Sequence, residues 1–288
     1  MQTPSGAAPA ILSIQSWVAY GHVGNAASVF PLQRLGAEVW AVNTVQFSNH
    51  PGYGAWRGSV FPAAHVREVV AGIAERGVLG RCAALLSGYC GDAATAAAIL
   101  EAAGQVKAAN PHALWCCDPV IGDAGRVYVA AGIPEFLRDR ALPEADIATP
   151  NAFELEWLTG IAPRTLAAAK AAIAALQARG PRIVLVTSLR TAETPADALD
   201  LLAGEGGRFW RLRTPLLPLA VHGTGDAISA LFLLHRLRGE TPAALGAAAS
   251  ALFGVLRRTA EAGAREMLLV AAQEELVAPA ERFTAEAC

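Results

Sequence analysis

The chain has 288 residues, of which 53% are hydrophobic and 17% charged, and its formal net charge is −2 at pH 7. This composition suits one large globular domain or two small ones, and the near-neutral charge gives no electrostatic basis for binding nucleic acid or an anionic membrane surface. No apolar run approaches the roughly 18 residues that a membrane span needs. The five cysteines form no C-x-x-C pair and are odd in number, which argues against a disulfide framework or a zinc site. We therefore expect a cytoplasmic protein.

The first elements of the chain predict a parallel sheet. Residues 1–10 lack the basic region and apolar core of a signal peptide and are expected to be a flexible tail. Residues 10–16 and 38–44 are apolar runs typical of buried strands, and residues 21–36 turn and enter a helix between them. A strand–helix–strand unit this short favours parallel strands. Residues 46–58 are expected to form a polar, glycine-rich and aromatic loop.

Helical and extended segments alternate through the rest of the chain. We expect helices at residues 65–77, 91–110, 134–140, 151–159, 166–179 and 242–263, and strands at 83–87, 114–118, 146–149 and 182–187. Residues 198–203 and 208–213 predict an antiparallel hairpin, whereas residues 267–276 fit either a strand or a helix. No repeat, charge block or linker divides residues 11–288. They are expected to form a single α/β domain of three layers, with a mostly parallel central sheet between helices and a small antiparallel hairpin.

The stretch HGTGDAISALFLLHRL, residues 222–237, predicts a ligand site at the start of a buried helix. Its apolar residues recur at roughly helical spacing, so the helix is expected to begin at Gly225 or Asp226. Glycines there let the backbone approach a ligand, and the first free N–H groups bind an anion at the positive end of the helix dipole. Asp226 would repel that anion unless it serves a second substrate, as the base for a hydroxyl that attacks a phosphate. The alternative is that Asp226 is only a first-turn helix cap.

Polar side chains follow the predicted parallel strands at their carboxyl ends, where ligands bind in such sheets. They are Ser16, Thr44 with the His50 loop, Ser87, Asp118, Thr149 with Asn151 and Glu154, and Thr187 with Ser188. Exposed loops are polar in any protein, but this does not account for Asp118 before Pro119 or for Glu154 one turn into a helix. Taken alone, each acid is better explained as a helix N-cap or a helix-surface acid than as a metal ligand. Beside a phosphate-type turn, we expect the two to hold Mg²⁺.

Several familiar catalytic signatures are absent. The chain has neither the G-x-x-x-x-G-K-[ST] loop nor the protein-kinase motifs, so a kinase here belongs to neither of those classes. It also lacks G-x-S-x-G and H-E-x-x-H, which removes the simplest hydrolase interpretations.

Seven stretches in this order resemble the pyridoxal kinases of the ribokinase-like superfamily: SIQSWVAYGHVGN, NTVQFSNHPGYG, LSGYCGD, CDPVIGD, DIATPNAFELEWLTG, IVLVTS and HGTGDAISALF. The resemblance covers residues 11–285. GTGD alone indicates only the superfamily, whereas NTVQFSNH and LSGY indicate the vitamin B6 branch. The resemblance implies ATP-dependent phosphorylation of the 5′-hydroxymethyl group of pyridoxal. It also implies a homodimer that needs Mg²⁺ and often a monovalent cation such as K⁺.

The same resemblance assigns roles to individual residues. Asp226 matches the catalytic base, and Gly223, Thr224 and Gly225 match the anion hole for the transferred phosphoryl group. The implied acceptor pocket consists of Ser16, Phe47, His50, Pro51, Tyr89 and Asp226. The implied ATP side consists of Asp118, Tyr128, Thr149, Glu154, Thr187, Arg213, Thr214, Pro215 and Leu216, with Asp118 and Glu154 toward the metal ion.

Two residues depart from the family pattern. The family usually has a substrate-contacting threonine after His50, where this chain has Pro51, which carries neither a hydroxyl nor a backbone N–H. It usually has histidine after Ser16, where this chain has Trp17. Both departures bear on the affinity for the acceptor. Pro51 also bears on the choice among pyridoxal, pyridoxine and pyridoxamine, but not on phosphoryl transfer.

Two alternative functions remain at this point. One is a hydroxymethylpyrimidine kinase, a family that often has cysteine at the position of Thr224 and lacks the NTVQFSNH stretch. The other is a non-catalytic B6-binding protein, of which Pro51 would be the mark and against which the intact Asp226, Asp118 and Glu154 argue.

Overall fold

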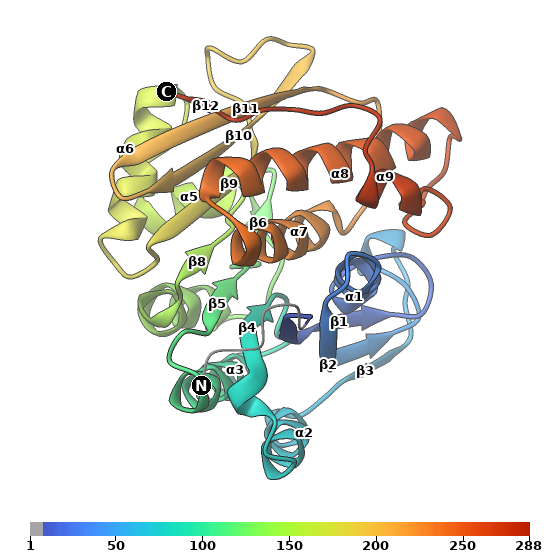
Figure 1. The fold of residues 1–288 in the computed structure, drawn as a ribbon, viewed down its shortest axis with the longest axis vertical. Helices are drawn as coiled ribbons and strands as arrows, with labels where there is room; N and C mark the ends of the chain where they lie inside the picture. The colour runs from blue at the N-terminus through green and yellow to red at the C-terminus, as the bar shows by residue number, and fades with distance from the viewer. Residues whose placement is uncertain (1–7) are drawn as a thin grey trace.

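One mixed sheet runs through the computed structural model, which describes residues 8–288 (Figure 1). Six central strands are parallel to their neighbours: β1 (Ala10–Val18), β2 (Glu38–Phe47), β4 (Cys82–Ser87), β5 (Leu114–Cys117), β8 (Ile147–Ala148) and β9 (Ile183–Leu189). Antiparallel strands extend both edges: β3 (Gly58–Val60), β10 (Ala198–Glu205), β11 (Arg208–Pro215) and β12 (Glu286–Ala287). The order across the sheet is β12-β11-β10-β9-β8-β5-β4-β1-β2-β3. The mostly parallel α/β sheet and the predicted hairpin are confirmed.

Helices cover both faces of this sheet. One face carries α2 (Ala63–Glu75), α3 (Ala93–Ala109), α4 (Ile133–Phe136), α5 (Ala152–Thr159) and α6 (Leu166–Gln177). The other carries α1 (Asn25–Arg34), α7 (Thr224–Arg238), α8 (Thr241–Glu261) and α9 (Gln273–Val277). Figure 1 shows α7 beside α8 on one face, and α2 near α3 on the other. Successive strand residues point to opposite faces, so Ile11 packs into one core and Leu12 into the other.

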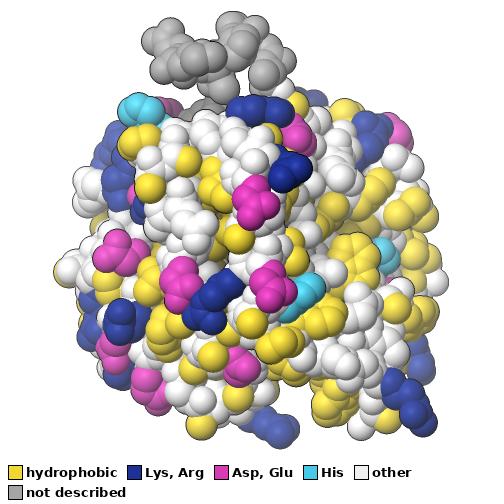
Figure 2. All heavy atoms as spheres, turned by 90° about the horizontal axis from the view of Figure 1, so that it is seen from below, with side chains coloured by type: hydrophobic (Ala, Val, Ile, Leu, Met, Phe, Trp, Pro, Cys, Tyr) yellow, Lys and Arg dark blue, Asp and Glu magenta, His cyan; other side chains and the backbone are white. Residues whose placement is uncertain are grey.

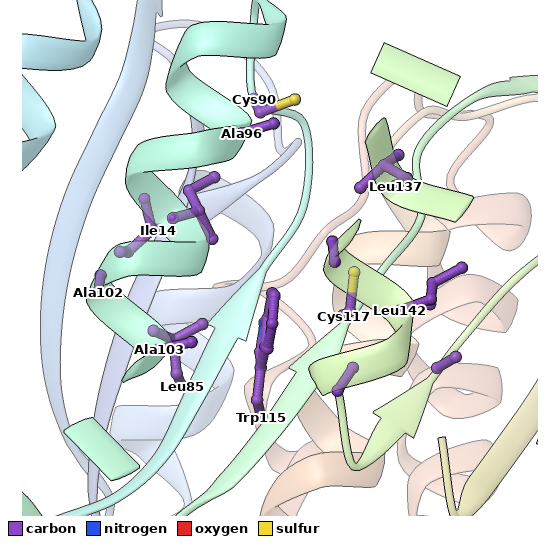
Figure 3. Close-up of a cluster of buried hydrophobic side chains, with 14 of the residues drawn as sticks. Ile14, Leu85, Cys90, Ala96, Ala102, Ala103, Trp115, Cys117, Leu137 and Leu142 are labelled. Atoms are coloured by element: carbon purple, nitrogen blue, oxygen red, sulfur yellow. The ribbon is translucent and has the colours of Figure 1, made fainter. Parts of the chain in front are cut away.

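Trp115 is a large buried side chain in the core under α3. Figure 3 shows its ring between Leu85 and Ala103 on one side and Leu142 on the other. Its indole N–H donates to the Ser87 hydroxyl at 2.9 Å, which satisfies the polar group of a fully buried ring. The adjacent Cys116 and Cys117 point into opposite cores, and burial raises the pKa of Cys117 to about 12. Both therefore act as small apolar residues.

The acceptor-side loop is more ordered than the sequence predicts. The loop expected at residues 46–58 is bounded by strands, because β2 continues to Phe47 and Gly58 begins β3, with a 3₁₀ turn at Pro51–Tyr53 between them. The three residues of β3 are all exposed and so carry no apolar alternation that could predict a strand. The Gln46–Gly58 expectation was therefore wrong at both ends.

Other short elements also differ from the predictions. The hairpin of β6 (Gly122–Asp123) and β7 (Arg126–Val127) was not predicted and forms a separate two-stranded sheet. The helix expected at 134–140 has only one α-helical turn, α4, followed by a π-helical turn. In the ambiguous segment 267–276, the structure has only the start of α9. Of the predicted tail, residues 1–7 lie outside the described residues, and Ala10 already belongs to β1.

Charges of both signs are interspersed on the surface seen from below. Figure 2 shows Lys and Arg side chains alternating with Asp and Glu on this face, with hydrophobic side chains between them. Within residues 8–288, no helix has both the length and the apolar composition required to span a bilayer.

Candidate active site

The carboxyl ends of the parallel strands bring most of the predicted site residues to one edge of the sheet. β1 lies between β2 and β4, so later strands of the chain lie on both sides of β1. Parallel sheets bind ligands at the carboxyl ends of the strands at such a switch point. Ser16 lies near the end of β1, and Phe47 is the last residue of β2. Asp118 follows β5 and Thr149 follows β8, while Thr187 lies near the end of β9.

The Gly-Thr-Gly turn forms the start of α7. Gly223 is the N-cap residue with φ +82°, in the left-handed region that favours glycine, and the helix begins at Thr224, one residue before the prediction. A Cβ atom at Gly223 would collide with the carbonyl oxygen of His22, whereas a Cβ at Gly225 would meet open space. No side chain caps this helix. Its first N–H groups therefore remain available to a ligand, as in an anion site.

Asp226 lies in the first turn of α7 and is half-buried. Burial raises the pKa of Asp226 to about 6, although the nearby backbone N–H groups of Gly24 and of Asp226 itself favour the carboxylate and oppose the rise. At neutral pH this group is ionised and more basic than an ordinary aspartate. These properties suit a general base.

Gly24 connects Asp226 to the acceptor side. Its φ is +56°, and a Cβ atom there would collide with both the carbonyl and the hydroxyl oxygen of Ser16. Its N–H lies near the Asp226 carboxylate and favours the ionised form, so residues far apart in the chain meet at one glycine. Sequence reasoning missed Gly24, because only its backbone conformation and its contacts distinguish it from the other glycines.

The predicted acceptor residues gather around the ends of β1 and β2. Phe47 packs in a small apolar cluster with Val18 and Val45, and Tyr89 is packed against this cluster. The hydroxyl of Thr44 donates to the backbone carbonyl of Tyr89 at 2.7 Å, which fixes the segment after β4 against β2. Phe47 and Tyr89 are therefore brought together.

His50 lies at the rim of this region, just before the 3₁₀ turn that contains Pro51. Its Nδ1 accepts a hydrogen bond from the N–H of Gly52 at 3.1 Å, so the neutral ring carries its proton on Nε2. The ring stacks on His222, which was not predicted, with centroids 3.8 Å apart and an interplanar angle of 30°. Burial and the neighbouring His222 lower the pKa of His50 to about 4, so the ring is neutral at pH 7.

Glu266 joins this rim from a distant part of the chain. Its carboxylate accepts hydrogen bonds from the hydroxyl of Tyr53 at 2.5 Å and from the backbone N–H of His22 at 3.2 Å. Glu266 follows α8 in a segment without helical or extended pattern, so sequence reasoning did not single it out. The contacts tie the acceptor-side loop to the loop after β1.

The carboxylates of Asp118, Glu154 and Asp226 lie close enough to one another to interact near the start of α7. Burial, and then the negative charges of Glu154 and Asp226, hold the pKa of Asp118 well above its usual range. The hydroxyl of Ser229, one turn beyond Asp226, contacts Asp118 at 3.4 Å and Thr149 at 2.8 Å. Ser229 could have been found from its i+3 spacing to Asp226. The helix thus connects the predicted base directly to the predicted metal side.

Glu154 is held by backbone groups. Its two carboxylate oxygens accept hydrogen bonds from the backbone N–H groups of Ile121 at 2.9 Å, Gly122 at 3.3 Å and Asn151 at 2.9 Å. Glu154 also forms a capping box with Asn151. The helix-cap interpretation that the sequence left open is therefore present in the structure. Burial still raises the pKa of Glu154.

The carboxylate oxygens at this site fit a cation that substrate phosphates would also bind. Within residues 8–288, only Ser229 donates to the Asp118 carboxylate, so Asp118 has oxygen lone pairs to offer a metal ion. No described group of three or more His, Cys, Asp or Glu side chains is arranged to hold a metal by itself. This pattern suits Mg²⁺, which protein sites often bind through one or two carboxylates together with water and substrate phosphates.

The remaining residues expected near the nucleotide are spread along the same edge. Tyr128 is exposed after β7 and Thr187 is buried in β9. The guanidinium of Arg213 donates to both oxygens of buried Asp200, at 2.7 and 2.8 Å, so this side chain already has an internal partner. Thr214 and Pro215 end β11, and Leu216 follows with its side chain exposed.

Comparisons with known proteins identify the family of this chain. A family model described as phosphomethylpyrimidine kinase matches residues 76–267. The pyridoxal kinase PdxY of Granulibacter bethesdensis is 61% identical over 96% of this chain and 99% of its own length, and that of Rubrobacter xylanophilus is 58% identical over 95% of each. The pyridoxal kinase of Leishmania donovani in complex with ADP and pyridoxine has a TM-score of 0.91 at 29% identity, covering 97% of this chain and 99% of its own. With a carboxylate at the start of α7 and acids beside it, the chain belongs to the pyridoxal kinase family.

Proposed function

We propose that this protein transfers the γ-phosphoryl group of ATP to the 5′-hydroxymethyl group of pyridoxal, giving pyridoxal 5′-phosphate for vitamin B6 salvage. The observation that carries the proposal is the 61% identity to a pyridoxal kinase across 96% of the chain. The turn that begins α7, with its uncapped N–H groups and Asp226, supplies the chemistry that such a transfer needs.

Phosphoryl transfer depends mainly on positioning and on stabilising negative charge. Asp226 accepts the proton of the attacking hydroxyl. The amides of the Gly223–Gly225 turn stabilise charge on the phosphoryl group as it passes from ATP to the acceptor. Gly24, which contacts both Ser16 and Asp226, places the acceptor pocket next to the base.

In this proposal Asp118 and Glu154 would hold Mg²⁺, and a monovalent cation such as K⁺ would assist. When bound, the metal ion neutralises phosphate charge. Glu154 is restrained by three backbone N–H groups, so Asp118 is the more available ligand. Thr149, Thr187, Tyr128 and the segment at Arg213–Leu216 border ATP.

Replacing Asp118 with asparagine should raise the Mg²⁺ concentration for half-maximal rate by about 10-fold or more, a typical cost of disturbing a metal site. The measurement is a Mg²⁺ titration at saturating ATP and pyridoxal. Asp146→Asn is a suitable control, because Asp146 precedes β8 at the opposite end of the strands and pairs with Lys107 at 3.0 Å. An unchanged Mg²⁺ requirement in Asp118→Asn would remove Asp118 from the metal side.

One assay distinguishes the proposed acceptor from its rivals. We expect ATP-dependent phosphorylation of pyridoxal to exceed that of hydroxymethylpyrimidine when both are measured in parallel with pyridoxine and pyridoxamine. Hydroxymethylpyrimidine is included because the family model that matches residues 76–267 is described as phosphomethylpyrimidine kinase. A preference for that substrate would contradict the proposal. Binding of B6 vitamers without turnover would indicate a carrier instead.

The protein is further proposed to act as a homodimer in the cytoplasm, as the family resemblance implies. Light scattering of the purified protein should give about twice the chain mass of 29.8 kDa. A monomer at micromolar concentration would contradict the proposed assembly.

A further inference from the structure

We propose that a buried chain of amide and hydroxyl side chains, formed by Ser13, Gln15, Asn25 and Ser28, positions Asp226 for catalysis. We refer to these four residues as the buried polar chain. The inference rests on the proposed role of Asp226 as the base. None of the four is assigned a contact with substrate.

Direct hydrogen bonds connect the buried polar chain from β1 to α7. The Gln15 amide donates to the hydroxyls of Ser13 at 3.0 Å and Ser28 at 3.1 Å. The hydroxyl of Ser28 then donates to the backbone carbonyl of Asp226 at 3.2 Å. This series leads from the central strand to the residue that carries the catalytic carboxylate.

A second branch fixes the start of α1. The Ser13 hydroxyl donates to the Asn25 side-chain carbonyl at 2.7 Å, and the Asn25 amide donates to the Val42 backbone carbonyl at 3.0 Å and to the Asn43 side chain at 2.8 Å. Asn25 is the first residue of α1 and follows Gly24 directly. The Gly24 N–H lies close enough to the Asp226 carboxylate to favour its ionised form, so holding Asn25 also holds this N–H in place. The buried polar chain thus acts on Asp226 at its backbone and at its carboxylate.

Stability alone does not explain these residues. All four members have 0% relative exposure, and burying polar groups is favourable only when they are fully paired. The side-chain oxygen of Gln15 has no hydrogen-bond partner within the described residues and lies against Gly88, where an added Cβ would be 2.7 Å from it. An unpaired buried oxygen costs free energy, so an apolar side chain of similar size would serve packing better. The retained amide is therefore explained by what its N–H groups hold in place.

Geometry at this site matters because a shift of about 1 Å in a catalytic group can cost roughly 100-fold in rate. Ser28→Ala removes the hydroxyl next to Asp226, and Gln15→Met removes the amide while nearly keeping its volume. We expect each to lower kcat by about 10-fold, with little change in KM for ATP. The low-pH limb of the rate profile should move upward, because a poorly aligned Gly24 N–H stabilises the Asp226 carboxylate less. Asp118 and Glu154 also face Asp226 and can contribute to the low-pH limb of the rate profile. The pH profiles are therefore compared between variants that retain both acids.

Ser250→Ala is the matched control. Ser250 is equally buried, at 3% exposure, and bonds Gly246 and Phe283 at 2.6 and 2.9 Å in α8, away from the strand ends. It should match the Ser28→Ala variant in thermal midpoint while keeping wild-type kcat and pH profile. If Ser250→Ala loses as much kcat as Ser28→Ala, the effect of Ser28→Ala is explained by a general loss of stability, and the proposal is overturned.

The decisive comparison combines Ser28→Ala with Asp226→Asn. If Ser28 acts through Asp226, adding Ser28→Ala to an Asp226→Asn enzyme should leave the residual rate within about twofold, since coupled residues are not additive. If Ser28→Ala and Gln15→Met both keep the wild-type kcat and pH profile while Asp226→Asn is impaired, the positioning role is overturned and the role of Asp226 as the base is kept. The same fold loss in the Asp226→Asn background would also overturn the positioning role. Normal turnover of Asp226→Asn itself would instead contradict the proposed base and, with it, the positioning of that base.

Discussion

Replacing Asp226 with asparagine should lower kcat by roughly 10² to 10⁴, the range typical for loss of a general base. Asparagine keeps the size and polarity of the side chain but cannot take the hydroxyl proton. The start of α7 and the acids near Asp118 should persist, so ATP binding should change little. Steady-state rates with pyridoxal, together with ATP binding measured by calorimetry, test both parts.

The pH profile adds an independent readout for the same residue. Because burial raises the pKa of Asp226 to about 6, a growing fraction of the carboxyl is protonated below that pH and cannot accept a proton. We expect kcat/KM of the wild type to fall on the acid side near pH 6 and the residual rate of Asp226→Asn to lack this limb. Any titration of the substrate, or of Asp118 and Glu154, whose pKa values burial also raises, should appear in both profiles and therefore cancel in the comparison.

Asp139→Asn controls for the loss of a carboxylate elsewhere. Asp139 pairs with Arg138 on the surface at 2.7 Å, far along the chain from α7. Its variant should keep wild-type kcat and pH dependence. An Asp226→Asn enzyme with near-normal turnover would exclude Asp226 as the base.

Replacing Gly223 with alanine should reduce both activity and stability. Its φ of +82° costs a non-glycine residue about 1–2 kcal/mol, and the added Cβ would collide with the His22 carbonyl. Relief of that collision must move either the turn or the loop after β1, which displaces the amides that face the phosphoryl group. We expect kcat to fall by about 10²-fold or more, as when an oxyanion donor is lost.

Two other glycines separate the causes. Gly207 in the β10–β11 hairpin has φ +76° and open space around its Cβ position, so Gly207→Ala carries the backbone strain without the collision. Gly225 has neither strain nor a collision, so Gly225→Ala should keep the thermal midpoint and lose activity only by placing a methyl group in the anion site. Thermal melts and kcat of the three variants provide the test. A Gly223→Ala enzyme with wild-type kcat would show that the turn does not need this geometry.

Local patterns in the sequence were sufficient for the architecture. Apolar runs of four to seven residues separated by helical periodicity indicated the central strands, because burial on both faces of a parallel sheet demands near-continuous hydrophobic residues. The hairpin of β10 and β11 followed from its glycine-rich turn. The exposed strand β3 and the β6–β7 hairpin were missed, since strands of two or three residues are too short to carry an alternation of apolar and polar residues. The π-helical turn after α4 likewise has no local signature.

For the candidate site, the sequence by itself determined the residue types and their place at strand ends: Asp118 after an apolar strand, and Asp226 after a glycine turn that opens a helix. Both follow from local rules, because glycine geometry and strand polarity act within a few residues. Only the tertiary structure decided how these groups meet. It places Gly24 against Asp226, ties Ser229 to Asp118, and stacks His222 on His50. Such contacts join residues far apart in the chain. The packing of α1 against α7 on one face of the sheet brings Gly24, which directly precedes α1, to the start of α7.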